Sequence, residues 1–350
     1  MVEKMPMPVT TDALAPALAP LVTAREEQGL AVALVPVAEI YDEFGHGAAT
    51  PDSINRFIRY AYENWQAPQP RYLLLVGDAT SDYRGYLATR PQDPVAPPAN
   101  VIPPYMIPVS YSGETVSDAR LADVAGDERP ELAVGRWPVD DARAVAALVE
   151  RTLAYESGAP AGRALFTTDG SSDEFRHVTE RILSRSQFPA DQSELLVGPS
   201  SAEVAERWNE GAWLVAYTGH GSLELWGKDV ILSTDAAGRL GSGSTPPIVL
   251  QLTCLSGLFA HPETVSLSEV LLSQENGPVL VIGATSLTLS AHQEPFAVAF
   301  LQALQDEKVT RIGDAVQQAK ESLDVGNAGL REISDTFGLI GDPSALIVRP

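Results

Sequence analysis

Residues 212–222 read Ala-Trp-Leu-Val-Ala-Tyr-Thr-Gly-His-Gly-Ser. An apolar run of strand length leads directly into Gly-His-Gly, which indicates a buried strand of a parallel sheet followed by a sharp turn. Glycine on both sides of His220 lets the backbone turn and brings main-chain N–H groups close to a ligand. We therefore expect His220 at the carboxyl end of a strand, where open α/β sheets place their ligands.

A second stretch, residues 247–257, has the same construction: Pro-Ile-Val-Leu-Gln-Leu-Thr-Cys-Leu-Ser-Gly. If the two strands are parallel neighbours, the Cys254 thiol and the His220 imidazole emerge at one edge of the sheet. A thiolate is a nucleophile, and an adjacent imidazole lowers the pKa of a thiol or accepts its proton. The N–H groups of Gly221 and Cys254 are candidates for an oxyanion hole. The alternative is that His220 merely ends a strand and that Cys254 is a buried core thiol.

The rest of the chain alternates short runs rich in Val, Leu and Ile with amphipathic stretches, which is typical of βα units around a mainly parallel sheet. Strands are predicted at residues 31–37, 72–76, 106–110, 131–134, 164–168, 212–217, 247–253, 278–283 and 345–348. Helices are predicted at residues 12–28, 51–65, 140–156, 173–186, 201–209, 266–274, 295–305 and 311–323. The fold class expected from this pattern is α/β.

A proline-rich segment, residues 80–104, interrupts this alternation and reads as a long connection. It predicts a smaller N-terminal α/β subdomain over residues 1–105 and a larger subdomain over residues 106–350. No internal repeat and no low-complexity run is found in the sequence.

The composition restricts the partners. The formal net charge of -22 argues against nucleic acid or an anionic membrane as the main partner, because phosphate contacts need clustered Lys and Arg. The same charge favours the approach of basic peptides, although solubility alone would also explain it. The single cysteine excludes an internal disulfide, and no stretch resembles a membrane span or a secretory signal.

The motifs resemble those of the catalytic domain of the gingipain family of cysteine peptidases, family C25 of the caspase-like clan. Tyr-Thr-Gly-His-Gly-Ser at 217–222 with Trp226 is similar to the histidine motif of the family, and Thr-Cys-Leu-Ser-Gly-Leu-Phe at 253–259 is similar to its cysteine motif. Further matches lie at residues 75–78, 126–136 and 337–343, in the family's order. The resemblance implies a caspase-like three-layer sandwich preceded by a smaller α/β subdomain.

The resemblance also implies roles for residues. Cys254 would be the nucleophile, His220 its acid-base partner, and Asp118 a third carboxylate that orients the imidazole, with Asp123 and Glu114 as rivals for that place. Asp127 resembles the aspartate at the bottom of the arginine-specificity pocket, and a buried carboxylate pairs well with a guanidinium. Trp226 would belong to the substrate-binding residues.

A departure from the family concerns the loop at residues 283–293, which should form a pocket wall. Where arginine-specific gingipains carry a Trp, this sequence offers Ala291 or His292. A more open pocket is the expected consequence.

The sequence thus predicts a cysteine endopeptidase that cleaves peptide bonds after Arg, and after Lys more weakly, without a catalytic cofactor. The family resemblance also leaves room for structural calcium, whose ligands are unknown, and for a secreted or cell-surface location. The alternative is a latent or inactive caspase-like binding or scaffold module that a partner or a processing event activates. An acyl transferase or esterase with the same dyad is a third possibility.

Overall fold

The computed structural model describes residues 4–83, 86, 100–159, 162–241 and 246–350. Much of the predicted proline-rich connection, residues 84–85 and 87–99, lies outside the described residues. The strands are β1 Met5–Thr10, β2 Val35–Pro36, β3 Pro70–Val76, β4 Met106–Val109, β5 Gly113–Val116, β6 Ala133–Trp137, β7 Arg163–Thr168, β8 Ser193–Val197, β9 Ala212–Thr218, β10 Leu225–Trp226, β11 Leu232–Ser233, β12 Ile248–Leu252, β13 Leu280–Ala284 and β14 Phe337–Ile340.

Eleven α-helices and three short 3₁₀ helices are assigned in the described ranges. The α-helices are α1 Ala19–Glu27, α2 Val37–Gly45, α3 Pro51–Asn64, α4 Ala142–Ser157, α5 Asp173–Ser186, α6 Ser201–Asn209, α7 Thr234–Ala237, α8 Leu267–Ser273, α9 Ser290–Gln305, α10 Ile312–Glu321 and α11 Ala328–Thr336. The 3₁₀ helices are η1 Ala15–Leu18, η2 Ala119–Ala122 and η3 Ala190–Gln192.

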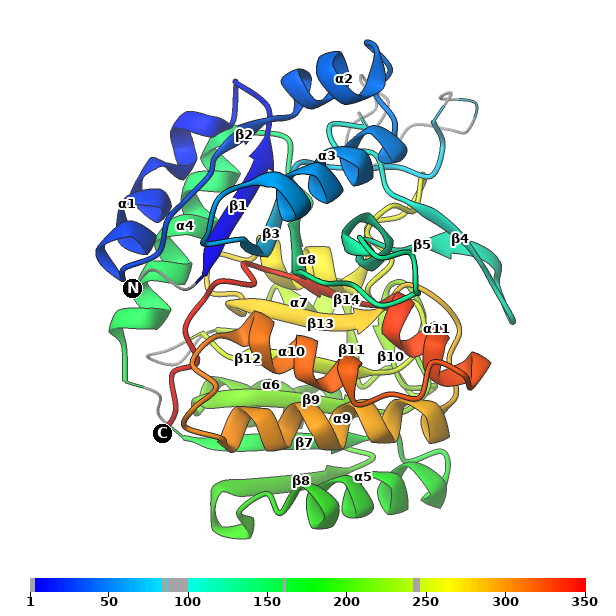
Figure 1. Ribbon diagram of the computed structural model, residues 1–350. Coiled ribbons are helices and arrows are strands. Elements are labelled where there is room, and N and C mark those ends of the chain that lie inside the picture. Colours follow the sequence, from blue (N-terminus) through cyan, green and yellow to red (C-terminus); the bar gives the residue numbers. More distant parts are fainter. Residues whose placement is uncertain (1–3, 84–85, 87–99, 160–161, 242–245) are drawn as a thin grey trace.

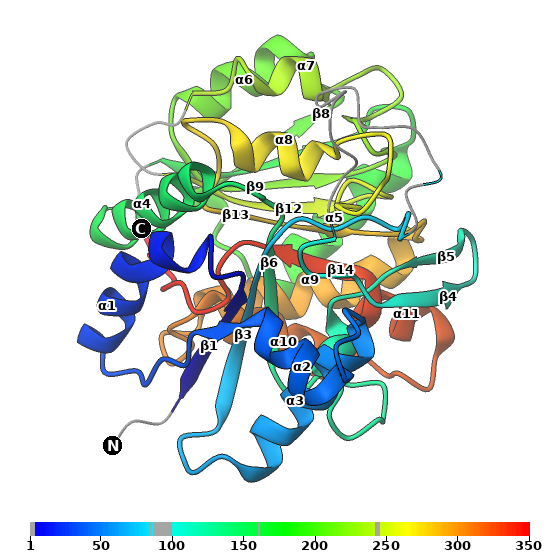
Figure 2. The ribbon, with the colours of Figure 1, turned by 90° about the horizontal axis from the view of Figure 1, so that it is seen from above.

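Ten strands form one sheet in the order β2-β1-β3-β6-β14-β13-β12-β9-β7-β8. Strands β13, β12, β9, β7 and β8 are parallel to one another, and β14 is antiparallel to β13. Helices cover both faces of this sheet (Figures 1 and 2), which gives the α/β class expected from the sequence pattern and the three-layer sandwich that the family resemblance implied. Because β6 pairs with β3, the sheet runs without interruption across residue 105, and the division into two subdomains stays a prediction.

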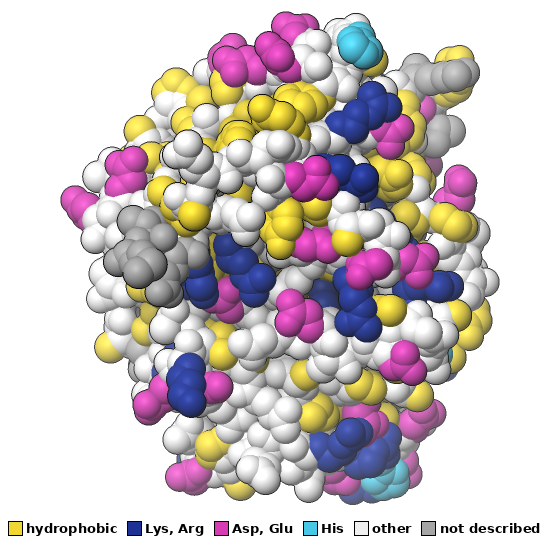
Figure 3. Space-filling view, in the orientation of Figure 1, with side chains coloured by type: hydrophobic (Ala, Val, Ile, Leu, Met, Phe, Trp, Pro, Cys, Tyr) yellow, Lys and Arg dark blue, Asp and Glu magenta, His cyan; other side chains and the backbone are white. Residues whose placement is uncertain are grey.

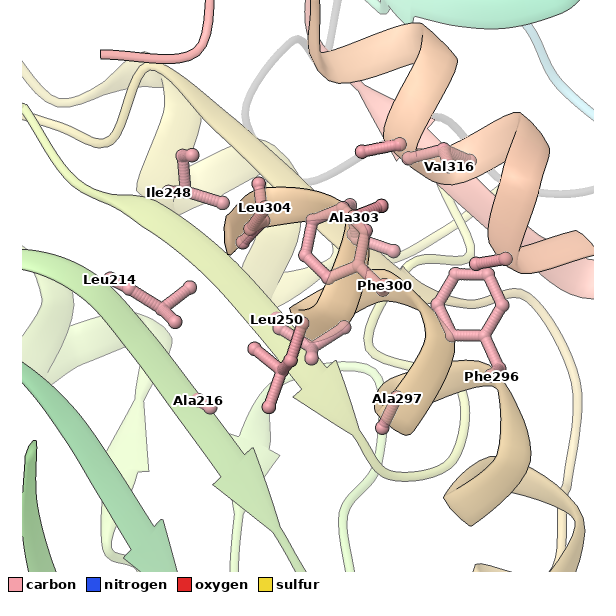
Figure 4. Packing of buried hydrophobic residues seen from close by; sticks show 14 of the residues in the cluster. Leu214, Ala216, Ile248, Leu250, Phe296, Ala297, Phe300, Ala303, Leu304 and Val316 are labelled. Carbon is pink, nitrogen blue, oxygen red and sulfur yellow. The ribbon is translucent and has the colours of Figure 1, made fainter. Parts of the chain in front are cut away.

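Successive side chains of the central strands point alternately to the two helical layers. Even-numbered residues of β9 and β12, such as Leu214 and Leu250, pack against α9, where Figure 4 shows Phe296 and Phe300. Odd-numbered residues, such as Val215, belong to a second buried cluster that includes side chains of α4, α6 and α8. Burial on both faces explains why these strands read as continuous apolar runs in the sequence.

A third cluster joins the N-terminal strands to α2 and α3. The predicted start of a helix at Thr50-Pro51 is confirmed: the Thr50 side chain accepts the N–H of Ser53 at 3.3 Å, and Pro51 takes the first helical position. Charged side chains of both signs are interspersed on the face shown in Figure 3, without one large basic field.

Candidate active site

Cys254 lies two residues beyond the end of β12, in a tight turn. The N–H of Ser256 donates to the carbonyl of Cys254 at 2.7 Å, and Leu255 has a φ of 60°, a left-handed conformation that is uncommon for a residue with a branched side chain. The N–H of Leu255 donates to Ser286 O, and the N–H of Gly257 donates to Ala284 O. The end of β13 and the two residues after it therefore hold the strained turn that presents the cysteine. Backbone strain of this kind is found most often at functional sites.

The sulfur of Cys254 faces the loop that follows β13. Thr288 N–H donates to Sγ at 3.4 Å, and Sγ lies 3.5 Å from Thr288 O. The Thr288 hydroxyl accepts from Gln293 Nε2 at 2.7 Å, which pins this loop to the first turn of α9. Cys254 is a free, partly exposed cysteine, so the alternative of a fully buried core thiol does not hold.

His220 lies two residues beyond the end of β9, and its main chain is held at three points. Its N–H donates to Asp169 Oδ2 at 3.3 Å, and its carbonyl accepts from Tyr217 Oη at 2.6 Å and from Gly227 N at 2.8 Å. The imidazole is exposed and meets the Phe175 ring edge-on, with 5.0 Å between the ring centroids. The backbone of His220 is therefore fixed, while the ring stays accessible to a substrate.

The two residues come from adjacent parallel strands, as the sequence predicted. β12 pairs with β9 in a register that sets Leu252 opposite Thr218. Within the described residues, Cys254 Sγ is hydrogen-bonded to Thr288 and not to His220. The structure thus brings the two strand ends together, and the pairing of the thiol with the imidazole stays a prediction.

The glycines beside His220 are required by close approach. A Cβ on Gly219 would lie 2.4 Å from Asp169 Cβ and 2.4 Å from Tyr217 Oη. A Cβ on Gly221 would lie 2.4 Å from Thr253 Oγ1, on the residue before Cys254. The His220 loop is therefore packed directly against the Cys254 strand end, which is where the proposed oxyanion donors, the N–H groups of Gly221 and Cys254, come from.

Asp169 is a member of the site that the sequence analysis did not single out. It follows β7, the other neighbour of β9, and is 1% exposed. Burial opposes its ionisation, but hydrogen bonds from Ser171 and from the N–H groups of His220 and Lys228 outweigh this and lower the pKa of its carboxyl. Its signal in the sequence was the same as for His220, a polar residue at a strand end followed by glycine.

Trp226 lies in the interior and not on a substrate-facing surface. Its indole is 0% exposed, stacks on Tyr217 with centroids 4.7 Å apart, and donates to Gln251 Oε1 at 2.7 Å. Direct contact with substrate, expected from the resemblance, is therefore not available to it in this conformation. The contacts give Trp226 a supporting role beneath the His220 loop.

Asp118 binds a buried arginine. Its two carboxylate oxygens accept from Arg136 Nε and Nη2, each at 2.7 Å, and the Arg136 side chain is 1% exposed. Arg136 belongs to β6, and β14, β13 and β12 lie between β6 and the strand of His220. The prediction that Asp118 orients the imidazole thus gains no contact from the described residues. The rival Asp123 is engaged by backbone N–H groups at residues 126–128, and Glu114 is exposed on β5.

Asp127 is exposed at the tip of the loop that precedes β6. Its Oδ1 accepts the N–H of Arg129 at 3.2 Å, and the next residue, Glu128, pairs with Arg331 of α11. A buried carboxylate at the bottom of a pocket, as the resemblance implied, is therefore not found at this position. The carboxylate is open to an approaching cation from solvent.

No group of three or more His, Cys, Asp or Glu side chains within the described ranges is arranged to hold a metal ion. Structural calcium stays a prediction, and no ligand can be assigned to it. The helices of the described chain include none that is long and apolar enough to span a membrane.

The fold and the site together define the class of caspase-like α/β proteins that carry a cysteine and a histidine at adjacent strand ends. Residues 7–348 match the profile of peptidase family C25. The chain therefore belongs to peptidase family C25, a family of cysteine-type endopeptidases.

Two curated relatives are gingipain R2 and gingipain R1 of Porphyromonas gingivalis, each 20% identical over 323 residues. The match covers 85% of this chain but only 40% and 30% of these two relatives. The fold is similar to the crystal structure of the Arg-specific cysteine proteinase gingipain R, with a TM-score of 0.76, 20% identity, and 98% of this chain and 78% of that chain covered. The complex of gingipain pro- and mature domains from Porphyromonas gingivalis gives a TM-score of 0.78 at 18% identity, over 98% and 79% of the two chains.

Proposed function

We propose that the chain is a cysteine endopeptidase in which Cys254 is the nucleophile and His220 is the acid-base group. The observation that carries the proposal is the pairing of β12 with β9. Leu252 of β12 lies opposite Thr218 of β9, and the cysteine and the histidine each come two residues after one of these paired residues. Membership in peptidase family C25 supports the same assignment.

The reaction follows from the chemistry of these groups. The Cys254 thiol passes its proton to the His220 imidazole, and the thiolate attacks the scissile carbonyl. The imidazolium returns the proton to the leaving amine, which departs and leaves an acyl-enzyme. Water, deprotonated by His220, then attacks the thioester and releases the carboxylic acid and the thiol. The N–H groups of Gly221 and Cys254 are the proposed donors to the oxyanion of each tetrahedral intermediate.

We propose basic peptides as substrates, cleaved after Arg and more weakly after Lys. Support comes from the relatives, which are named gingipain R, and from a related solved structure described as Arg specific. The net charge of -22 attracts cationic peptides. Asp127 is the proposed partner of the guanidinium, and its exposed position suits a surface contact more than a closed pocket. A secreted or cell-surface location accompanies this proposal on the basis of the family resemblance alone.

The test is hydrolysis of matched fluorogenic peptides ending in Arg, Lys, Asp or Leu by wild-type protein and Cys254→Ala, under reducing conditions with and without calcium. We expect turnover of the Arg peptide that is lost in Cys254→Ala. Asp127→Asn should lower kcat/KM for the Arg peptide, while the exposed control Asp191→Asn should not. Full Arg activity in Asp127→Asn would remove Asp127 from recognition, and turnover that survives in Cys254→Ala would refute the mechanism.

One observation favours the second candidate, a latent module activated by a partner or by processing. The Cys254 sulfur is occupied by both main-chain groups of Thr288 and not by His220. A latent protein would show slow alkylation of Cys254 by iodoacetamide and no turnover with reduced thiol. An active enzyme should show fast, His220-dependent alkylation and cleavage of its own purified chain after Arg.

A further inference from the structure

Three large apolar side chains are exposed on the loop after β13, which contacts Cys254, and on the β4–β5 hairpin, which is hydrogen-bonded to this loop. Leu287 is 37% exposed, Leu289 is 46% exposed and Tyr111 is 55% exposed. We call these three residues the apolar rim. Exposed apolar side chains that gather beside a reactive group mark a binding surface more often than singly scattered ones do.

The loop after β13 places two of them around the sulfur. Thr288, whose N–H and carbonyl both approach Cys254 Sγ, stands between Leu287 and Leu289 in the chain. Gln293 donates to the Thr288 hydroxyl at 2.7 Å and is itself 3% exposed, so the loop is anchored from the interior. Leu287 and Leu289 are therefore exposed on the same anchored loop whose main chain contacts the Cys254 sulfur.

The β4–β5 hairpin adds Tyr111 and fixes the same loop. Ser112 Oγ lies 2.8 Å from Ser286 Oγ and accepts the N–H of Leu287 at 3.2 Å. Below them, Thr285 Oγ1 donates to Val116 O at 2.7 Å. On the other side of Tyr111, Ser110 N–H donates to Glu332 Oε1 at 2.9 Å. The loop and the hairpin that carry the apolar rim are thus tied to each other before a ligand arrives, which reduces the entropy that binding costs.

We propose that the apolar rim is a specificity surface for a bulky apolar side chain of the substrate, next to the scissile bond. The inference rests on the proposed peptidase function and adds a second requirement to it. The preferred substrates are peptides in which a Leu- or Phe-like residue accompanies the basic residue. The basic residue supplies charge recognition, and the apolar residue covers Leu287, Leu289 and Tyr111.

The experiment uses a set of peptides with one Arg, in which a single neighbouring position on either side of the scissile bond holds Leu or Asn. Wild-type kcat/KM is measured for each peptide, and the affinity of each peptide for Cys254→Ala is measured by fluorescence anisotropy. The variants are Leu287→Asn with Leu289→Asn together, Leu289→Asn alone, and the control Val197→Asn. Val197 is 51% exposed on β8, the last strand of the sheet, and β12, β9 and β7 lie between it and β13.

We expect Leu at one position to raise both the affinity and kcat/KM by about tenfold or more, which is the gain from burying one leucine side chain. The double variant should abolish this preference with an unchanged melting temperature, and Val197→Asn should keep it. Cys254-dependent cleavage with no preference for Leu at any position would overturn the inference and leave the proposed function intact. Preference for Leu in binding to Cys254→Ala, without turnover by the wild-type protein, would support the rim and refute the peptidase.

Discussion

Cys254 and His220 occupy equivalent positions on adjacent parallel strands, each two residues beyond one member of the register pair Leu252–Thr218. Because side chains alternate along a strand, the paired residues Leu252 and Thr218 point to the same side of the sheet, and the turns that carry Cys254 and His220 begin side by side. The contacts agree: Cys254 meets Thr288 ahead of α9, and His220 meets Phe175 of α5. The register of β12 against β9, more than any contact between the two side chains, is what brings these two chain segments to the same edge of the sheet.

Asp169→Asn should lower the free energy of unfolding by about 2 kcal/mol, because the buried carboxylate accepts charge-assisted hydrogen bonds that an amide accepts less well. Because the pKa of Asp169 is lowered in the folded protein, the ionised carboxylate contributes its full stabilisation at pH values above 3.8, the ordinary pKa of an aspartate. This stabilisation is lost as the pH falls through the lower pKa of the folded state. Urea unfolding of wild type and variant at pH 7 and at pH 3 measures this stabilisation. The difference in the free energy of unfolding between wild type and variant should be smaller at pH 3 than at pH 7. Equal differences at both pH values would contradict a stabilising role for the ionised carboxylate. Exposed Asp191→Asn is the control.

Gly221→Ala should abolish most activity and destabilise the fold by about 1–3 kcal/mol, because the new Cβ would overlap Thr253 Oγ1. The Thr253 hydroxyl is buried and has no hydrogen-bond partner in the described chain, so Thr253→Ala itself should cost little. Combining the two substitutions should therefore restore part of the lost activity. Gly238→Ala, whose Cβ would have its nearest neighbour at 3.7 Å, is the matched control. A double variant no better than Gly221→Ala would show that the clash is not the cause.

Trp226→Phe should cost about 1–3 kcal/mol of stability, because it removes the donor to buried Gln251 Oε1. It should also lower kcat, since the indole supports the His220 loop through Tyr217. Guanidinium unfolding and peptide kinetics measure the two effects. Trp65→Phe, at a partly exposed position beside Phe57, should change neither by a comparable amount. A change in KM alone, at unchanged stability, would instead place Trp226 against the substrate.

Asp118→Ala should destabilise the protein by about 3–5 kcal/mol, because it leaves the Arg136 guanidinium buried without its carboxylate. The pH profile of kcat/KM should stay unchanged in Asp118→Asn, since the carboxylate contacts Arg136. The double variant Asp118→Ala with Arg136→Met should be more stable than Asp118→Ala alone. A displaced pH profile at wild-type stability would return Asp118 to the role of third catalytic group.

The positions of the central strands were accessible from the sequence, because burial on both faces makes them continuous apolar runs. The strands predicted at 212–217, 247–253 and 278–283 correspond to β9, β12 and β13, and the adjacency of the first two is confirmed. Strand β1 was missed because Pro6 and Pro8 argue against a strand within a sheet. β8 was missed because it is partly exposed and mixes polar and apolar residues. β5 was missed because its sequence, Gly-Glu-Thr-Val, is half exposed, and β14 because its four residues follow α11 without a break. The strand predicted at 345–348 is wrong: one isolated bridge, Arg311 with Leu346, is all that is assigned there.

The site was harder to predict where tertiary contacts decide the role of a residue. The strand-end pattern around Cys254 and His220 is local and could be read directly. The place of Asp169 depends on β7 lying beside β9, although they are far apart in the chain. Likewise, the burial of Trp226 depends on the strands and helices that cover it, and the engagement of Asp118 depends on Arg136. A residue type and its neighbours in the chain do not carry that information.

β14 is the last strand of the chain, yet it lies in the interior of the sheet between β13 and β6. The residue before it, Thr336, accepts the N–H of Thr285 at 3.0 Å, at the base of the loop that reaches Cys254. A ribosome-bound chain that has not yet released residue 340 therefore consists of two half-sheets with open edges and an unsupported nucleophile loop. Synthesis of β14 therefore closes the sheet and completes the support of the loop that reaches Cys254.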